Sequence, residues 1–126
     1  MIPPRRINVA IVDDDAAVRV ALRRLCEAFG WRAIAYASGR EFLDSLAEES
    51  FDCVLLDAQM PGMAGLEVQT CLKERGVLVS TLVLTGSEAG ERERYLAAGA
   101  LEVLRKPIGD HELQSAVEAA VVRREA

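Results

Sequence analysis

The sequence predicts an α/β domain in which five parallel strands form one sheet with helices on both of its faces. Short apolar runs alternate five times with segments whose apolar residues recur every three or four positions, as in amphipathic helices. Five strand–helix units in a row favour a parallel sheet. The central run is apolar at every position, which is typical of a strand buried on both faces. The 126 residues suit one domain, residues 1–126, with no output domain in the chain.

The first two strand–helix units are expected between residues 7 and 48. Residues 7–12 form an apolar strand, and the helix that follows ends at Gly30, a residue typical of helix C-termini. Residues 31–37 form a weaker strand. Ser38 and Glu41 have the spacing of a capping box, so the second helix is expected from Ser38 to about residue 48.

The other three units occupy the rest of the chain. Residues 51–57 are the most apolar strand, and a loop around Pro61 leads to a helix at residues 66–75. The fourth strand is expected at residues 77–85 and the fourth helix at residues 88–98. A short strand at residues 100–104 comes before Lys106 and Pro107. The last helix has one apolar face, formed by Leu113, Ala116, Val117, Ala120 and Val121.

Composition and charge argue against several classes of function. The net charge of -5 offers no basic surface for nucleic acid or anionic lipid. No segment is apolar for long enough to be a signal peptide or a membrane span. Cys26, Cys53 and Cys71 are odd in number and form no CxxC pair, so neither a zinc site nor a disulfide framework is expected. A cytoplasmic protein with small buried cysteines fits these features.

Polar side chains lie where the predicted strands end. They are Asp13 and Asp14 after the first strand, Asp57 at the end of the third, Thr85 at the end of the fourth, and Lys106 after the fifth. Because the carboxyl ends of parallel strands meet at one edge of the sheet, we expect these side chains to converge. A single aspartate after a strand is more often a helix cap, which is our interpretation of Asp15. The ordered set favours a functional site.

The chemistry of this set points to phosphoryl transfer. Three neighbouring carboxylates repel one another, and oxygen ligands without histidine or cysteine suit a hard cation, Mg²⁺ or Mn²⁺. A carboxylate beside such an ion can attack phosphorus and form an acyl phosphate. The ion, the ammonium group of Lys106 and the hydroxyl of Thr85 are the groups needed to stabilise charge on the phosphoryl oxygens.

Four segments in this order resemble the receiver domain of two-component response regulators, the family of the chemotaxis protein CheY. They are residues 9–15 (VAIVDDD), 55–65 (LLDAQMPGMAG), 82–86 (LVLTG) and 106–107 (KP). The resemblance covers residues 7–122, and its loop and turn are most similar to the FixJ-like group. It implies a flavodoxin-like (βα)5 fold of three layers, with strand order 2-1-3-4-5.

The resemblance also implies roles for the site residues. Asp57 would accept a phosphoryl group from a sensor histidine kinase or a histidine phosphotransfer protein. The implied metal ligands are Asp13, Asp14, Asp57 and the backbone carbonyl of Gln59. Thr85 and Lys106 would contact the phosphoryl group, and the Lys106–Pro107 bond would be cis. Such a domain catalyses only its own phosphorylation and dephosphorylation and is not an enzyme in the usual sense.

Signalling in this family is a shift between conformations. The family usually has an aromatic residue three positions before the lysine, but this sequence has Val103, so the usual coupling of the threonine to an aromatic ring cannot operate. Gln59 and Ser87 lie at positions expected to tune the lifetime of the phosphate. The fourth helix has a charged first half with few core anchors, so we expect it to move and, with the fifth strand, to offer a surface for a homodimer or a partner.

Three alternatives stay open at this point. The chain could be a pseudo-receiver that binds a partner and never carries phosphate, a phosphorelay shuttle, or an enzyme on a similar sheet. The intact acidic set argues against the first. Aspartate-dependent phosphatases need a second aspartate where this chain has Gln59, and no GxGxxG or GxxxxGK[ST] motif follows the first strand. The FixJ-like resemblance favours the amino-terminal part of a longer transcription factor over a single-domain regulator.

Overall fold

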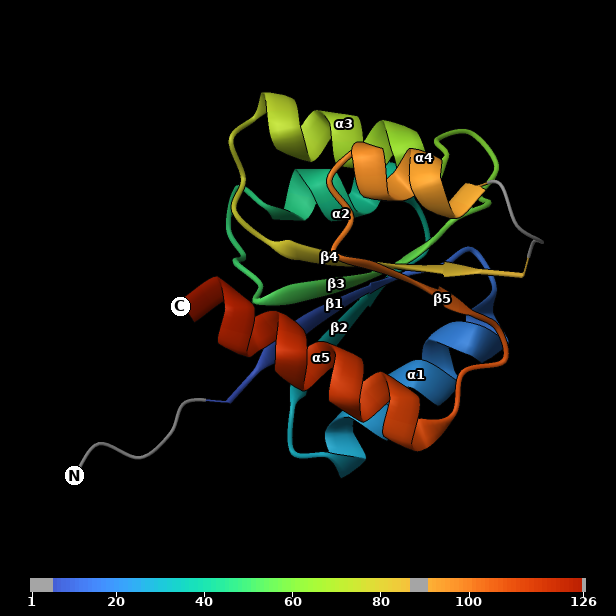
Figure 1. The fold of residues 1–126 in the computed structure, drawn as a ribbon, viewed down its shortest axis with the longest axis vertical. Helices are drawn as coiled ribbons and strands as arrows, with labels where there is room; N and C mark the ends of the chain where they lie inside the picture. The colour runs from blue at the N-terminus through green and yellow to red at the C-terminus, as the bar shows by residue number, and fades with distance from the viewer. Residues whose placement is uncertain (1–5, 87–90, 126) are drawn as a thin grey trace.

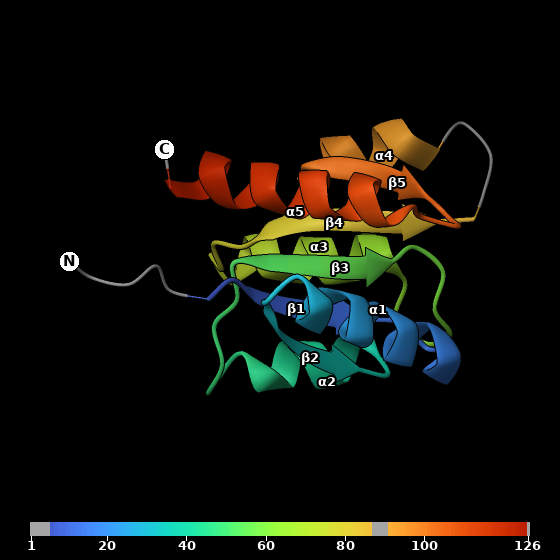
Figure 2. The same ribbon diagram turned by 90° about the horizontal axis from the view of Figure 1, so that it is seen from below.

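The computed structural model of the protein describes residues 6–86 and 91–125 (Figure 1). Its strands are β1 (Asn8–Val12), β2 (Arg32–Tyr36), β3 (Cys53–Asp57), β4 (Ser80–Thr85) and β5 (Glu102–Arg105). They form one parallel sheet in the order β2-β1-β3-β4-β5, which Figure 2 shows from below. The predicted fold class and strand order are confirmed.

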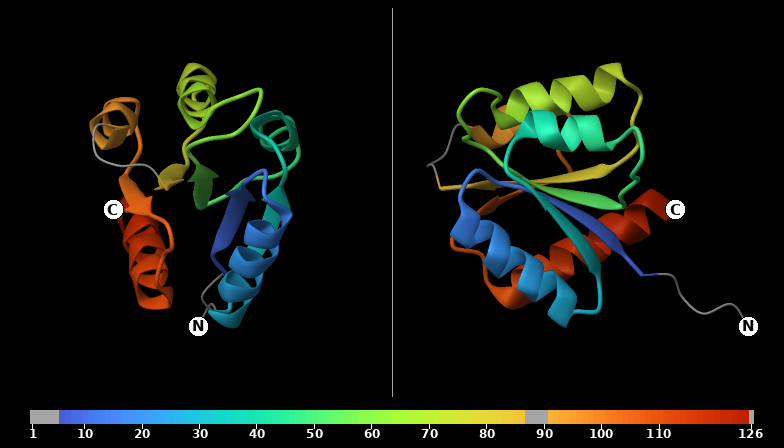
Figure 3. Two further views of the ribbon diagram at one scale, coloured as in Figure 1. Left: turned by 90° about the vertical axis from the view of Figure 1, so that its right-hand side faces the viewer. Right: turned by 180° about the vertical axis from the view of Figure 1, so that it is seen from behind.

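Five helices cover the two faces of this sheet. They are α1 (Ala16–Ala28), α2 (Gly39–Ser45), α3 (Gly65–Glu74), α4 (Glu91–Ala97) and α5 (Asp110–Glu125). Figure 3 shows α1 and α5 on one face, and α2, α3 and α4 on the other. Among the described residues, no helix has both the length and the apolar character that a membrane crossing requires.

Helices bury both faces of the sheet, and successive side chains of each strand point to opposite faces. Side chains at neighbouring strand positions therefore enter two separate cores. In β1, Val9 and Ile11 pack in the core beneath α1 and α5, whereas Ala10 and Val12 pack in the core beneath α2 and α3. All four side chains are fully buried. This arrangement explains why the central strands are apolar at every position rather than at every second one.

Cys26 and Cys53 belong to the core beneath α1 and α5. Both are buried free thiols, and burial raises the pKa of Cys26 to about 12. Cys71 is also free and only partly buried. The prediction of buried apolar cysteines therefore holds fully for Cys26 and Cys53 and only in part for Cys71.

The predicted caps begin the first two helices. The carboxylate of Asp15 accepts hydrogen bonds from the backbone N–H groups of Ala17 and Val18, which confirms it as the cap of α1. The hydroxyl of Ser38 accepts from the N–H of Glu41 at 3.2 Å. The Glu41 carboxylate accepts from the N–H of Ala37 at 3.0 Å, one residue before the cap, so the reciprocal half of the box is displaced by one position.

The predicted first residues of three strands were wrong by two or three positions. The fourth strand was expected from residue 77 but begins at Ser80. The N–H of Val77 instead closes the end of α3 on the carbonyl of Leu72 at 3.0 Å, and Leu78 is 82% exposed. The third strand begins at Cys53, two residues later than expected, and the carboxylate of the preceding residue, Asp52, accepts from the N–H of Asn8 at 2.8 Å. The fifth runs over Glu102–Arg105, two residues later than expected at its start.

Gly65 allows α3 to begin close to the end of β3. A methyl group at Gly65 would lie 3.1 Å from the carbonyl oxygen of Asp57, and 3.3 Å from both the Cα of Ala58 and the ring of Tyr95. We expect Gly65→Ala to lower the free energy of unfolding by about 1–3 kcal/mol, because backbone atoms must shift to admit the methyl group. Chemical denaturation measures this change. In the control Gly86→Ala the added methyl meets nothing within 4 Å, and equal stability of the two variants would contradict the expectation.

Candidate functional site

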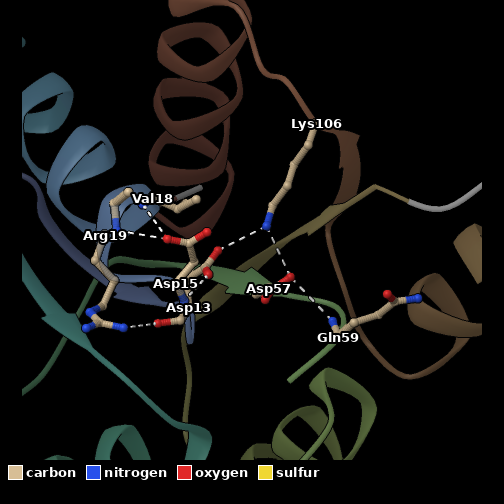
Figure 4. A network of polar contacts seen from close by, with 8 residues as sticks. Asp13, Asp15, Val18, Arg19, Asp57, Gln59 and Lys106 are labelled. Atoms are coloured by element: carbon tan, nitrogen blue, oxygen red, sulfur yellow. Dashed lines mark hydrogen bonds and ion pairs between the residues drawn. The ribbon is translucent and has the colours of Figure 1, made fainter. Parts of the chain in front are cut away.

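The carboxyl edge of the sheet brings together the side chains predicted from the strand ends. Asp13 directly follows β1, Asp57 is the last residue of β3, and Lys106 directly follows β5. Figure 4 shows the three side chains pointing toward one another. Asp13 is 1% exposed and Asp57 is 6% exposed, so both carboxylates lie almost out of contact with water.

Three carboxylates of this edge could hold one cation. Asp13, Asp14 and Asp57 each offer an oxygen, and the three oxygens lie within 4.8 Å of one another. Asp13 and Asp57 are buried, whereas Asp14 is exposed to solvent. An all-oxygen set that is partly open to water suits Mg²⁺ or Mn²⁺, which keep water in several of their coordination positions. The residues present therefore fit the metal that the sequence predicted.

The electrostatics of Asp57 also favour a bound cation. Burial raises the pKa of the Asp57 carboxyl, and the negative charge of Asp13 raises it further. The ammonium of Lys106 and a hydrogen bond from the N–H of Gln59 act in the opposite direction without cancelling the rise. A divalent ion between the carboxylates would offset the repulsion between their negative charges, because each carboxylate is attracted to the ion.

Lys106 links the two buried carboxylates. Its Nζ lies 3.1 Å from Asp13 Oδ2 and 3.3 Å from Asp57 Oδ1 (Figure 4). Burial lowers the pKa of Lys106, but the hydrogen bonds and charges of Asp13 and Asp57 outweigh it, so the net pKa is raised. The lysine therefore stays charged at neutral pH. The Lys106–Pro107 peptide bond is cis.

Backbone and side-chain hydrogen bonds hold the carboxylates in place. Asp13 Oδ1 accepts from the N–H of Asp15 at 2.9 Å, and Arg19 Nη1 donates to the backbone carbonyl of Asp13 at 2.8 Å. Asp57 Oδ1 accepts from the N–H of Gln59 at 3.4 Å. The turn after β1 is thus tied to α1, so the oxygen atoms are oriented before any ligand arrives.

The raised pKa of Asp57 predicts how stability depends on pH. The folded metal-free protein holds this proton more tightly than the unfolded chain, so its free energy of unfolding decreases as pH rises from about 4 through the raised pKa. Lys106 affects stability in a different, alkaline pH range. Its contribution to the free energy of unfolding is fully present below its ordinary pKa and is lost only as pH rises through the raised pKa. Denaturation in EDTA at a series of pH values measures the slope. A slope in Asp57→Asn equal to that of the wild type would contradict this assignment.

The other predicted site residues have different environments. Thr85 is buried at the end of β4, and its carbonyl accepts from the N–H of Lys106 at 2.8 Å. Gln59 is exposed, and the role of its carbonyl as a ligand stays a prediction. Val103 is partly buried against the cluster that contains Tyr95. Ser87 lies outside the described residues, as do the first residues of the predicted fourth helix.

Two residues near the site were missed in the sequence. Arg19 supports the turn of Asp13, and Tyr95 of α4 donates from its hydroxyl to the carbonyl oxygen of Ala58 at 3.0 Å. A signal for Arg19 was present, because it lies one helical turn after the cap of α1. Tyr95 is the one aromatic residue of the described part of α4, but its contact with Ala58 depends on how the helix lies on the sheet.

Comparison with known proteins gives a consistent result. Residues 9–118 match the model of the response regulator receiver domain family. Nodulation protein W of Bradyrhizobium diazoefficiens is 34% identical over 116 residues, which are 91% of this chain and 51% of that protein. Transcriptional regulatory protein FixJ of Azorhizobium caulinodans is 33% identical over 121 residues, 95% of this chain and 57% of that protein. The chain thus spans about half the length of these curated relatives.

Solved structures agree with the sequence comparison. A response regulator receiver protein from Burkholderia phymatum is 45% identical with a TM-score of 0.84, over 93% of this chain and 96% of that one. The FixJ-N crystal structure has a TM-score of 0.88 at 26% identity, over 94% of this chain and 96% of that one. With the fold and the acidic edge described above, these matches show that the chain belongs to the response regulator receiver domain family of two-component systems.

Proposed function

We propose that this receiver domain accepts a phosphoryl group on Asp57 in a reaction that depends on Mg²⁺. The observation that carries the proposal is the meeting of Asp13, Asp14 and Asp57 within 4.8 Å, with Lys106 in contact with two of them. The donor is a phosphohistidine on a sensor kinase or on a phosphotransfer protein. The chain acts as a signalling domain rather than as an enzyme for a separate substrate.

The chain's own residues each have a task in this reaction. An oxygen of Asp57 attacks the phosphorus, a phosphorus–oxygen bond forms, and the phosphorus–nitrogen bond of the donor breaks, leaving its electron pair on the imidazole, which takes a proton from water. Lys106 contacts a phosphoryl oxygen, and the Thr85 hydroxyl donates to another. The cation, when bound, neutralises negative charge on the carboxylates and the phosphoryl oxygens. It would be held by Asp13, Asp14, Asp57 and the Gln59 carbonyl.

The output is a shift in population toward the conformation that contacts the phosphoryl group best. Phosphorylation adds negative charge and acceptor oxygens at Asp57, which attract Thr85 and Lys106. Helix α4 is the element expected to respond, because only one of its described residues is buried. Its exposed Arg92 forms a 2.7 Å ion pair with Glu102 of β5. The α4–β5 surface is also the surface we propose for a homodimer or partner.

Phosphorylation by a small donor tests the proposal without a cognate kinase. We expect acetyl phosphate with Mg²⁺ to add the mass of one phosphoryl group to the intact protein, and EDTA to prevent the addition. Circular dichroism and a Mg²⁺ titration establish that the protein is folded and binds the ion. If both hold and no mass is added, the chain is an interaction module that never carries phosphate. Catalytic turnover of a phosphorylated small molecule would instead indicate an enzyme.

A further inference from the structure

Tyr95 attaches α4 to the segment that carries Asp57. Tyr95 is 4% exposed and is the only buried residue in the described part of α4. Its hydroxyl donates a 3.0 Å hydrogen bond to the carbonyl oxygen of Ala58, the residue directly after Asp57. A single side chain of this helix therefore contacts the backbone next to the proposed phosphoacceptor.

The ring of Tyr95 fills a space that small side chains leave open. It packs in a cluster with Ala58, Val83 and Ala100, against which Leu66 and Val103 are partly buried. Gly65 lies close enough that a methyl group there would be 3.3 Å from the ring. Among the residues of this cluster, Tyr95 supplies the one aromatic ring. Helix α4 thus provides the ring in a region where β5 has only the short side chain of Val103.

A chain of hydrogen bonds connects Tyr95 to the end of β4. The N–H of Ala58 donates to the carbonyl of Leu84 at 2.9 Å, and Leu84 directly precedes Thr85. The carbonyl of the same Ala58 accepts from Tyr95. Movement of the end of β4 toward a group on Asp57 therefore acts on Ala58, the residue whose carbonyl accepts the hydrogen bond of Tyr95.

Among the described residues, the other polar contacts that hold α4 are weak. Gln69 Nε2 of α3 donates to the backbone carbonyl of Tyr95 at 3.4 Å, a long hydrogen bond. The ion pair of Arg92 with Glu102 is exposed, and such pairs contribute little to stability. A change in the Tyr95 contact therefore has a large influence on the position of α4.

We propose that Tyr95 transmits the state of Asp57 to α4. Its hydrogen bond to Ala58 stabilises the arrangement of α4 in the unphosphorylated protein, and a phosphoryl group on Asp57 shifts the population to an arrangement in which this bond is broken and the ring repacks. The inference rests on the proposed function, because it requires a ligand on Asp57. Tyr95 is a positioning residue, since it does not touch the reacting atoms.

Fluorine NMR of the tyrosines tests this role without changing Tyr95. The sequence has two tyrosines, Tyr36 and Tyr95, so protein labelled with 3-fluorotyrosine gives two resonances that Tyr36→Phe assigns. With Mg²⁺ present throughout, beryllofluoride is added as a phosphoryl mimic at Asp57. We expect the Tyr95 resonance to move and that of Tyr36, which packs against Phe42 and Phe51, to stay in place. A Tyr95 resonance unmoved at saturation overturns the proposal.

Removal of the hydroxyl alone gives an independent test. Tyr95→Phe keeps the ring but loses the bond that favours the unphosphorylated arrangement, so we expect beryllofluoride to bind about fivefold more tightly, the factor that one net hydrogen bond is worth. Calorimetric titration measures the affinity, and Tyr36→Phe is the matched control, with unchanged affinity. An affinity of Tyr95→Phe equal to or below that of the wild type overturns the role of the hydroxyl.

Failure of this inference differs from failure of the proposed function. If acetyl phosphate adds no phosphoryl group and beryllofluoride does not bind, both are wrong. If the wild type is phosphorylated and binds beryllofluoride while neither Tyr95 test responds, only the role of Tyr95 is wrong.

Discussion

Asp57→Asn is expected to abolish phosphoryl incorporation completely. The amide has nearly the shape of the carboxylate but lacks the charged nucleophilic oxygen that attacks phosphorus, and it is a weaker ligand for a hard cation. Burial and the repulsion of Asp13 raise the pKa of the wild-type carboxyl, and the neutral amide avoids the cost of both. We therefore also expect the metal-free variant to be more stable than the wild type at neutral pH.

Intact mass after incubation with acetyl phosphate and Mg²⁺ measures the first effect, and chemical denaturation in EDTA measures the second. Asp15→Asn is the matched control, because it removes a neighbouring negative charge while asparagine still caps α1. We expect this control to be phosphorylated like the wild type. A phosphoryl group on Asp57→Asn at the wild-type rate would show that another residue is the acceptor.

Lys106→Gln is expected to slow phosphorylation by about 100-fold. The ammonium lies 3.1 Å from Asp13 and 3.3 Å from Asp57, so it is already placed where negative charge increases during transfer. Loss of one such oriented donor from an active site commonly lowers the rate by about two to three orders of magnitude. Glutamine keeps a polar side chain of similar reach but carries no charge.

The initial rate of mass addition from acetyl phosphate measures this effect. Lys73→Gln is the matched control, because Lys73 is the other lysine of the sequence and lies exposed on α3, away from the acidic edge. We expect that variant to react at the wild-type rate. If Lys106→Gln reacts at a rate within about threefold of the wild-type rate, Lys106 does not stabilise the transition state of phosphoryl transfer.

The sequence predicted the acidic site well because its residues lie directly at strand ends. Asp13, Asp57 and Lys106 needed only the rule that parallel strands share one carboxyl edge, and the structure brings all three together. The start of β4 was predicted less well, since Val77 and Leu78 are apolar in sequence although one closes α3 and the other is exposed. Hydrophobicity alone does not separate a strand from a loop that follows a helix.

Tyr95 shows what the sequence could not predict. The charged first half of the fourth helix indicated that few of its side chains enter the core. In the structure, Tyr95 alone among the described residues of α4 is buried. That this residue bonds the backbone next to Asp57 depends on the rotation of α4 over the sheet and on the small side chains beneath it. Neither property is local in sequence, so the structure was needed to find the contact.

Crystals grown with Mn²⁺ test the central claim most directly, because anomalous scattering locates the ion itself. The account predicts one strong peak at the carboxyl edge, with carboxylate oxygens from the first and third strand ends among its ligands. The contradicting result is a folded protein, crystallised in saturating Mn²⁺, whose Asp13, Asp14 and Asp57 side chains point apart with no anomalous peak between them.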